Sequence, residues 1–437
     1  MNVPSSSPVR ALLRLVFTLL LTAYQPASGY DIQTHDALTQ RAVQFSDLRM
    51  KLPRFGLALD TSKFTCSSDS ITYGKDTNSC RPEPFISISR LVGFGAIWED
   101  DRRDLQALSH FYNPLNNAPL RLAALAGAAL TNTSPDWATA DAGIPPQQLY
   151  SFVDGRRYFL EALTKPSQID RNTQWGLTFQ VLGHVCHHIQ DMAQPQHVRN
   201  DPHLDATDLV GEAAAAYVTR MSRWLLGEPS GMESWARQRS QLDAIVGINP
   251  TYDLAVLKSQ FKSARKFWST PDGKGIADYA NRNFVSTGTN FRATRTGYLS
   301  HPDFPNPSAV NIAFEKVQFA TLEPDLASHG LSGEIWFAVT KADDRVLGTS
   351  ANVRQSTYSA FSPELDRKGS SWRFALNKYN YQSHTDQLFP RAIAYSAGLI
   401  NYFFRGDIDM YRMSSDSTRY LIKNNGPESM TGTFTLY

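Results

Sequence analysis

The stretch GHVCHHIQDMAQPQH, residues 183–197, constrains the fold most, because it gathers four of the chain's ten histidines and one aspartate. His187 and Asp191 are four residues apart in a helical pattern, so their side chains share one face. Imidazole and carboxylate on one face form a natural pair of zinc ligands. Pro195 is expected to end the helix because it lacks an N–H. Beyond this break His197 can point back toward the same pocket, which predicts a concave metal site.

The other polar residues of this stretch have simpler interpretations. His184 lies one turn before His187 and is expected either to support a ligand or to pack in the core. His188 is one residue away from the ligand face. Cys186 is interpreted as a buried helix residue, with a zinc thiolate as the alternative.

Hydrophobic residues recur at helical spacings over most of the chain. Spacings of three and four predict helices in THDALTQRAVQFS, QQLYSFVDGRRYFLEALT, QWGLTFQVLGHVCHHIQDMA, DLVGEAAAAYVTRMSRWLL and QLFPRAIAYSAGLINYFF. Residues 350–385 are expected to be irregular, whereas STRYLIKN and GTFTLY alternate like strands around the turn residues NNGPE. We therefore predict a mainly α, multi-helical domain over residues 30–410 and a short C-terminal β-strand segment over residues 411–437. That segment either packs on the helical body or begins a second domain.

The N-terminus, residues 1–29, is expected to be a signal peptide. The basic start MNVPSSSPVR precedes the apolar run ALLRLVFTLLLTAY, and Ala27-x-Gly29 is a small-residue cleavage signature. The run is shorter than the roughly 20 apolar residues of a membrane span. Cleavage after Gly29 would leave Tyr30 as the first residue of a soluble protein that is secreted or periplasmic.

Charge and cysteine usage bear on the partners and the compartment. The whole chain has 43 Lys and Arg against 41 Asp and Glu, and removal of the signal peptide takes Arg10 and Arg14 away. The resulting neutrality argues against a broad surface for duplex DNA or anionic lipid, so no stable nucleic-acid partner is expected. Cys66 and Cys80 flank a polar loop and are expected to form a disulfide in an oxidising compartment.

The run HHIQDMAQPQH resembles the metal motif of the zinc-dependent phospholipase C family, which the related single-strand-specific nucleases share. The resemblance implies a mostly α-helical exported enzyme that holds three zinc ions at the bottom of a cleft and cleaves phosphodiester bonds. It is most specific over residues 30–42, 96–114 and 175–220.

The first ligands that the resemblance implies lie at the expected mature N-terminus. The family uses the amino group and carbonyl of its first mature residue, usually Trp, and then a His. Here Tyr30 and His35 take these places. Tyr in place of Trp is a departure from the family, but both chelating atoms belong to the backbone.

Next, the family has an acidic residue and then a His in a context like HFYDP. The segment GAIWEDDRRDLQALSHFYNP offers Asp100 and His110 for these roles. Glu99 and Asp101 are the alternatives to Asp100.

The family also has a His and an acid four residues apart, after the proline break. Asp208 and Glu212 have this spacing in DLVGE. Asp208 stands where the family has His, and a more oxygen-rich site would suit another divalent ion. His203 is the alternative source of an imidazole.

The resemblance thus implies about three Zn²⁺ ions per chain. The three sets are Asp100, His110, His187 and Asp191; His197, Asp208 and Glu212 with water; and the Tyr30 backbone, His35 and Asp191. Clustered zinc ions neutralise phosphate charge, activate water and steady the leaving oxygen. Asp100 is expected to orient or deprotonate that water.

A phospholipid or another phosphodiester is the expected substrate, with transient contact to a membrane surface. Two alternatives remain. One is a single-strand-specific nuclease of the same fold, and the other is a catalytically degenerate, metal-stabilised binding protein.

Overall fold

A computed structural model describes residues 31–65, 85–100, 109–120, 132–140, 149–201, 231–294, 296–358, 374–416, 418–426 and 429–430. The expected signal peptide and the predicted strand GTFTLY lie outside these residues. No helix of the described part is long and apolar enough to cross a membrane.

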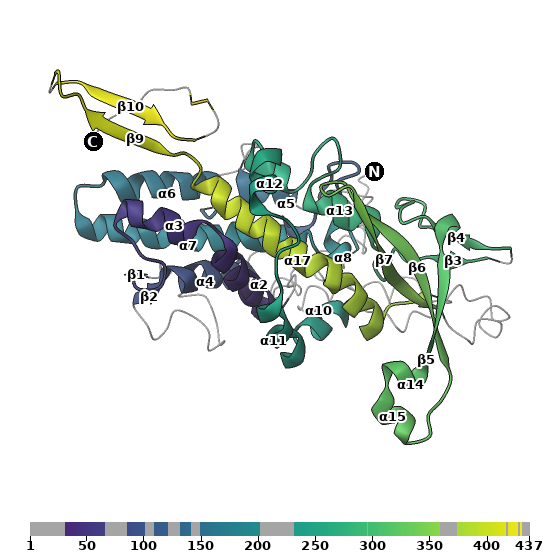
Figure 1. Ribbon diagram of the computed structural model, residues 1–437. Helices are drawn as coiled ribbons and strands as arrows, with labels where there is room; N and C mark the ends of the chain where they lie inside the picture. Colours follow the sequence, from purple (N-terminus) through teal and green to yellow (C-terminus); the bar gives the residue numbers. More distant parts are fainter. Residues whose placement is uncertain are drawn as a thin grey trace, which may run out of the picture.

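Helix α7 is the element around which the site is built. The long helices of the described part are α2 (Ile32–Phe45), α4 (Ile88–Asp100), α6 (Phe152–Thr164), α7 (Gln168–Asp191) and α17 (Lys378–Phe403). The other four pack against α7, and α2 also contacts α4 and α17 (Figure 1). Ser167 caps the start of α7 by accepting a hydrogen bond from the backbone N–H of Asp170.

The end of α7 differs in detail from the sequence prediction. The helix already ends at Asp191, and Pro195 is the first residue of the short helix α8 (Pro195–Val198). Gln194, before the proline, is extended, as the proline ring requires. The predicted break is therefore confirmed, and it places His197 on a separate short helix.

Two glycines let α4 and α7 approach closely. A Cβ atom on Gly183 would lie 2.0 Å from the carbonyl oxygen of Val92, and one on Gly95 would lie 1.9 Å from that of Gln180. Only a residue without a side chain fits at either position. This contact fixes the position of the end of α4, with its acidic residues, against the histidine-bearing half of α7.

The C-terminal half of α7 is buried on all sides. Its residues Val185 and Ile189 belong to the same hydrophobic cluster as Ala392 and Tyr395 of α17. Because the polar side chains of this half are enclosed as well, they must find partners inside the protein.

The described part also contains shorter helices. They are α3 (Leu48–Lys51), α5 (Ser134–Thr139), α10 (Gly231–Ala236), α11 (Arg239–Gly247), α12 (Leu254–Gln260), α13 (Ile276–Asn283), α14 (Phe319–Leu322) and α15 (Pro324–Ser328), with 3₁₀ turns at Leu52–Phe55, Ala264–Phe267 and Ala309–Asn311. Of these, α14 and α15 lie beyond the end of strand β5 (Ala313–Gln318), away from the helical body (Figure 1).

The mainly α fold class predicted from the sequence is wrong, because the chain also forms antiparallel sheets. The largest has the order β5-β6-β7-β8, made of Ala313–Gln318, Glu334–Asp344, Thr349–Tyr358 and Phe374–Ala375. Three two-stranded sheets pair β1 (Lys63–Thr65) with β2 (Phe85–Ser87), β3 (Arg292–Ala293) with β4 (Tyr298–Leu299), and β9 (Ile408–Arg412) with β10 (Tyr420–Asn424). The protein is therefore a mixed helix-and-sheet fold.

Strand β7 contains several polar residues, and the sequence analysis predicted it as part of an irregular segment. Gln355 is fully buried, donates to the backbone carbonyl of Asn283 at 2.6 Å and accepts from the N–H of Val285 at 3.3 Å. Ser356 donates to the carbonyl of Ala375 at 3.1 Å. These bonds allow a polar strand to be buried, but they depend on residues distant in sequence.

The C-terminal hairpin confirms the strand predicted in STRYLIKN, as β10. Its partner is β9, which precedes it, and the hairpin extends away from the helical body (Figure 1). Ile408, Met410 and Ile422 remain exposed on it.

Candidate metal centre

Five of the predicted metal ligands are brought together in the interior. They are His35 of α2, Asp100 at the end of α4, His110, and His187 and Asp191 of α7. All five have exposed fractions of 1% or less. The four-residue spacing on α7 places His187 and Asp191 side by side, with His187 Nε2 3.2 Å from Asp191 Oδ2.

Four of these side chains surround one point. His110 Nδ1 lies 3.1 Å from Asp191 Oδ2 and 3.4 Å from Asp100 Oδ1. His187 Nε2 lies 3.4 Å from the same Asp100 oxygen and 3.4 Å from His110 Nδ1. This is the first ligand set that the sequence analysis predicted.

Asp191 also faces a second set of ligands. Its Oδ1 atom lies 3.4 Å from His35 Nε2, whereas Oδ2 faces His110 and His187. The rings of His35 and His187 stack with centroids 3.7 Å apart. Asp191 therefore stands between two groups of nitrogen donors, with one carboxylate oxygen toward each.

The side chains around Asp191 place several possible metal-ligand atoms close together in the interior. Both of its oxygens and His110 Nε2 are buried and form no hydrogen bond with the described residues. Possible ligand atoms lie within 4.8 Å of one another in three groups: His35, His187 and Asp191; Asp100, His110 and His187; and Glu99, His110 and His188. Nitrogen and carboxylate donors so placed fit a divalent metal such as zinc, so these residues could hold a metal ion.

Neighbouring groups fix the orientation of the imidazole rings. Nδ1 of His187 lies 2.7 Å from the carbonyl oxygen of Ala96, and Nδ1 of His35 lies 2.7 Å from Oε1 of Gln190. Such contacts place the proton on Nδ1 and leave Nε2 for a metal. Gln190 is itself held by donating to Thr39 at 2.8 Å.

Glu99 is the residue whose role the sequence analysis missed, since it was considered only as an alternative to Asp100. It lies 2.5 Å from His184 Nδ1 and 2.9 Å from His188 Nε2 and accepts from Trp137 Nε1 at 3.3 Å. It also lies 3.7 Å from Nε2 of His110, whose Nδ1 faces the first ligand set. The adjacent acids of the WEDD segment were the signal, but spacing alone could not separate their roles.

We expect Glu99→Gln to lower zinc affinity by about 10- to 100-fold, the usual effect of losing a partner of a ligating histidine. An amide presents an N–H₂ group where these rings now meet a carboxylate, so the orientation of His110 should loosen. The measurement is competition for zinc with a chromophoric chelator. Glu161→Gln, on the partly exposed face of α6, is the matched control. Unchanged zinc affinity with only a lower melting temperature would show that Glu99 supports the fold alone.

The remaining predicted site residues lie either at the border of the cluster or outside the described part of the chain. His197 stacks on Phe111 with centroids 4.5 Å apart, its Nδ1 lies 3.1 Å from the carbonyl oxygen of His110, and it is 3.9 Å from Asp191 Oδ2. It borders the cluster without joining the three groups above. Other predicted residues lie outside the described part: Tyr30, Cys66, Cys80, Asp101, His203, Asp208 and Glu212.

Cys186 is a buried helix residue, as its simpler interpretation held. It is a free thiol, fully buried beside the carbonyl of Ser396. Burial raises its pKa to about 12, so the thiolate that binds zinc is disfavoured.

Opposite charges shift the protonation of the cluster. Burial lowers the pKa of His110, but the charge of Asp191 and the contact with Glu99 outweigh it and raise the pKa to about 9. Burial raises the pKa of Asp191, yet the charge of His187 outweighs this and holds that pKa well below its ordinary value. In the metal-free chain these groups therefore form buried ion pairs.

The raised pKa of His110 predicts that metal affinity increases with pH. A metal ion bound by His110 would have to displace the proton from this ring, so apparent affinity should rise from pH 6 and level off near pH 9. The stability of the metal-free fold changes with pH in the opposite direction. Its stabilisation by this group is complete below pH 6.5 and is lost as pH rises through about 9. Zinc titrations between pH 6 and 9.5 test this, and a flat affinity profile would contradict it.

Comparison of the chain with models of protein families, with curated proteins and with solved structures finds no match. We therefore infer the function of the protein from the geometry of this centre and from the motif resemblance.

Proposed function

We propose that this protein is an exported zinc-dependent phosphodiester hydrolase, similar to phospholipase C. The observation that carries the proposal is the position of Asp191, whose Oδ1 faces His35 and whose Oδ2 faces His110 and His187. A carboxylate placed in this way suits the bridging of two metal ions. Clustered zinc ions supply phosphate neutralisation, an activated water and stabilisation of the leaving oxygen.

The chain's own residues would hold and orient this centre. Asp100, His110, His187 and Asp191 are proposed to hold one ion, and His35 and Asp191, with the Tyr30 backbone, a second. A third would require His197 together with Asp208 and Glu212.

Asp100 is proposed to act as the base. Its carboxylate lies at the ligand set, 3.4 Å from both His110 Nδ1 and His187 Nε2. From there it can orient the attacking water and accept its proton. Burial of the acid excludes bulk water, which strengthens its interaction with the reacting groups.

Metal content and hydrolysis, measured on the same sample, test this function. Mature protein purified without chelator should begin at Tyr30 and contain about three zinc ions per chain by elemental analysis. It should hydrolyse a choline phosphodiester and leave single-stranded DNA intact. Cleavage of the DNA instead would favour the nuclease alternative. One ion or none, without hydrolysis, would favour a degenerate binding protein.

A further inference from the structure

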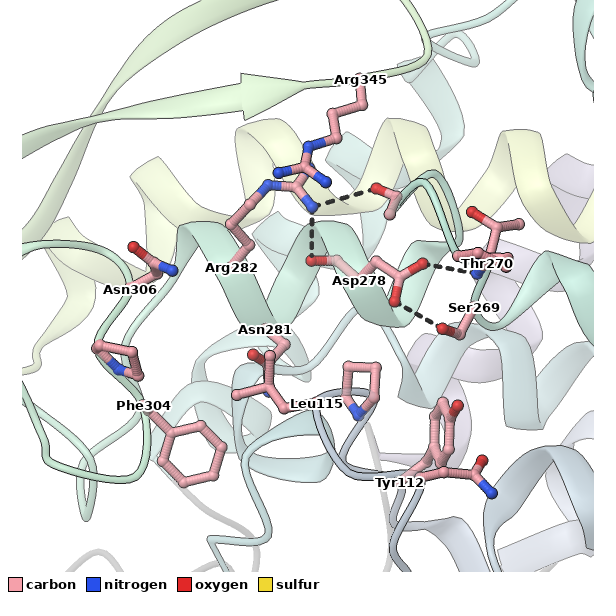
Figure 2. A pocket seen from close by; sticks show the side chains of 15 residues that line it. Tyr112, Leu115, Ser269, Thr270, Asp278, Asn281, Arg282, Phe304, Asn306 and Arg345 are labelled. Carbon is pink, nitrogen blue, oxygen red and sulfur yellow. Dashed lines mark hydrogen bonds between the residues drawn. The ribbon is translucent and has the colours of Figure 1, made fainter.

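A cavity of about 550 Å³ lies outside the metal centre, whose five clustered residues are not among those that line it. Its walls come from the segment after His110, from α13 and the loop before it, from residues 304–306 and from the β6–β7 turn. Figure 2 shows Arg282 and Arg345 on one side of it and Tyr112, Leu115 and Phe304 on the other. The size and the mixed lining are those of a small-ligand site.

Hydrogen bonds connect the cavity wall to the metal centre. The backbone N–H of Tyr112 donates to the carbonyl of His197 at 3.1 Å, and the amide of Asn281 donates to the carbonyl of Val198 at 2.6 Å. Tyr112 follows the ligand His110 by two residues. The wall is thus held by the same two segments that carry His110 and His197.

A buried arginine ties other parts of the wall to the same segment. Arg199 is 1% exposed and donates to the carbonyls of Asn281 and Asn306 at 2.8 Å each. Its guanidinium also lies over the ring of Phe304, 4.5 Å from the centroid. These contacts pre-form the cavity next to residues 197–199.

Two further arginines converge at the rim. A Cβ atom on Gly273 would lie 2.5 Å from Nη1 of Arg345 and 3.2 Å from Nη1 of Arg282. The φ angle of +72° at Gly273 suits glycine as well. Two guanidinium groups near one point repel each other unless an anion lies between them.

The acidic groups nearby leave room for such an anion. The ion pairs of Arg282 and Arg345 in the described part both go to Asp343, at 3.6 and 3.4 Å. Asp278 is turned toward other donors, accepting from Ser269 at 2.7 Å and from backbone N–H groups at 2.9 and 3.0 Å. Asp272 pairs with Lys274 at 2.9 Å. Arg282 also donates to the backbone carbonyls of Gly273 at 3.1 Å, Asp278 at 3.3 Å and Asp343 at 2.9 Å, and Arg345 donates to that of Asp272 at 3.2 Å. Among the described residues the two arginines therefore share one exposed carboxylate, that of Asp343.

We propose that this cavity binds a second phosphate group of the substrate, beyond the phosphodiester that reacts at the metal centre. The inference rests on the proposed function. Arginine forks match phosphate oxygens in geometry and charge, and Tyr112, Leu115 and Phe304 provide apolar surface for the ring that carries the phosphate. A bisphosphorylated nucleoside and a bisphosphorylated inositol share this chemistry.

Matched ligand pairs test the proposal by calorimetry on the zinc-loaded mature protein that begins at Tyr30. Thymidine 3′,5′-bisphosphate is compared with thymidine 5′-monophosphate, and inositol 1,4-bisphosphate with inositol 1-phosphate. In one pair the bisphosphate should bind at least tenfold more tightly than the monophosphate. That pair shows whether the substrate is a nucleotide or an inositol phosphate. Arg345→Gln, at a side chain 47% exposed, should remove most of this gain and leave monophosphate affinity unchanged. Arg157→Gln on α6, at a side chain 49% exposed that also pairs with an acid, should change neither.

The outcomes separate this proposal from the proposed function. No bisphosphate gain in either pair, or a gain that survives Arg345→Gln, would overturn the second-phosphate site. Because the assay measures binding without turnover, a bisphosphate gain in a chain that hydrolyses nothing would contradict the hydrolase alone.

Discussion

Asp191→Asn is expected to empty the metal centre and to lower phosphodiester hydrolysis by about 10³-fold. The carboxylate contacts His35 through one oxygen and His110 and His187 through the other. An amide keeps the volume but loses the charge and one oxygen donor, so both groups of ligands lose their shared member. If the lost transition-state stabilisation is about 4 kcal/mol, the rate falls by about three powers of ten.

The measurements are zinc per chain and the hydrolysis rate of a choline phosphodiester. Asp386→Asn on α17 is the matched control, since that carboxylate is hydrogen bonded to Gln382 on the exposed face and lies outside the three candidate metal groups of the described residues. The control should keep both metal and activity. Full zinc content and full activity in Asp191→Asn would refute the centre as proposed.

Local spacing and motif context predicted the part of the site that depends on nearby residues. His187 and Asp191 share a face because one helix carries both, and that relation needs no tertiary information. Asp100 and His110 came from the motif resemblance, and the structure brings them to the same point. The role of Glu99 could not be assigned, because only packing decides which of two adjacent acids meets His184 and His188.

The sheets escaped prediction for a related reason. Strand β7 contains Asn352, Arg354 and Gln355, whose polarity disfavours a buried strand in sequence patterns. Burial of Gln355 becomes possible because Asn283 and Val285 supply its hydrogen bonds from another element. Likewise, the close contact of Gly95 with α7 depends on residues 85 positions apart in sequence, so helical periodicity alone gave no sign of it.

Removal of metal is expected to lower the melting temperature by about 4 °C. Glu99, Asp100 and Asp191 are at most 1% exposed, in the same enclosed region as the histidines. Without a cation, the charge of Asp191 is balanced mainly by the protonated rings of His110 and His187, which is a costly arrangement inside a protein. An ion present at 1,000 times its dissociation constant stabilises the fold by about 4 kcal/mol. A chain of this size shifts by roughly 1 °C per kcal/mol, because the entropy of unfolding grows with chain length.

Calorimetric melts of the chelated and the zinc-loaded chain, with elemental analysis of both, measure this effect. Addition of zinc to the chelated chain should restore the original midpoint, which separates metal loss from damage by the chelator. Asp191→Asn should melt near the chelated wild type and respond little to chelation, because its ligand groups are already broken. Equal midpoints after complete zinc removal would mean that the buried acids are balanced by their histidines alone. The ion would then contribute to the reaction but not to the stability of the fold.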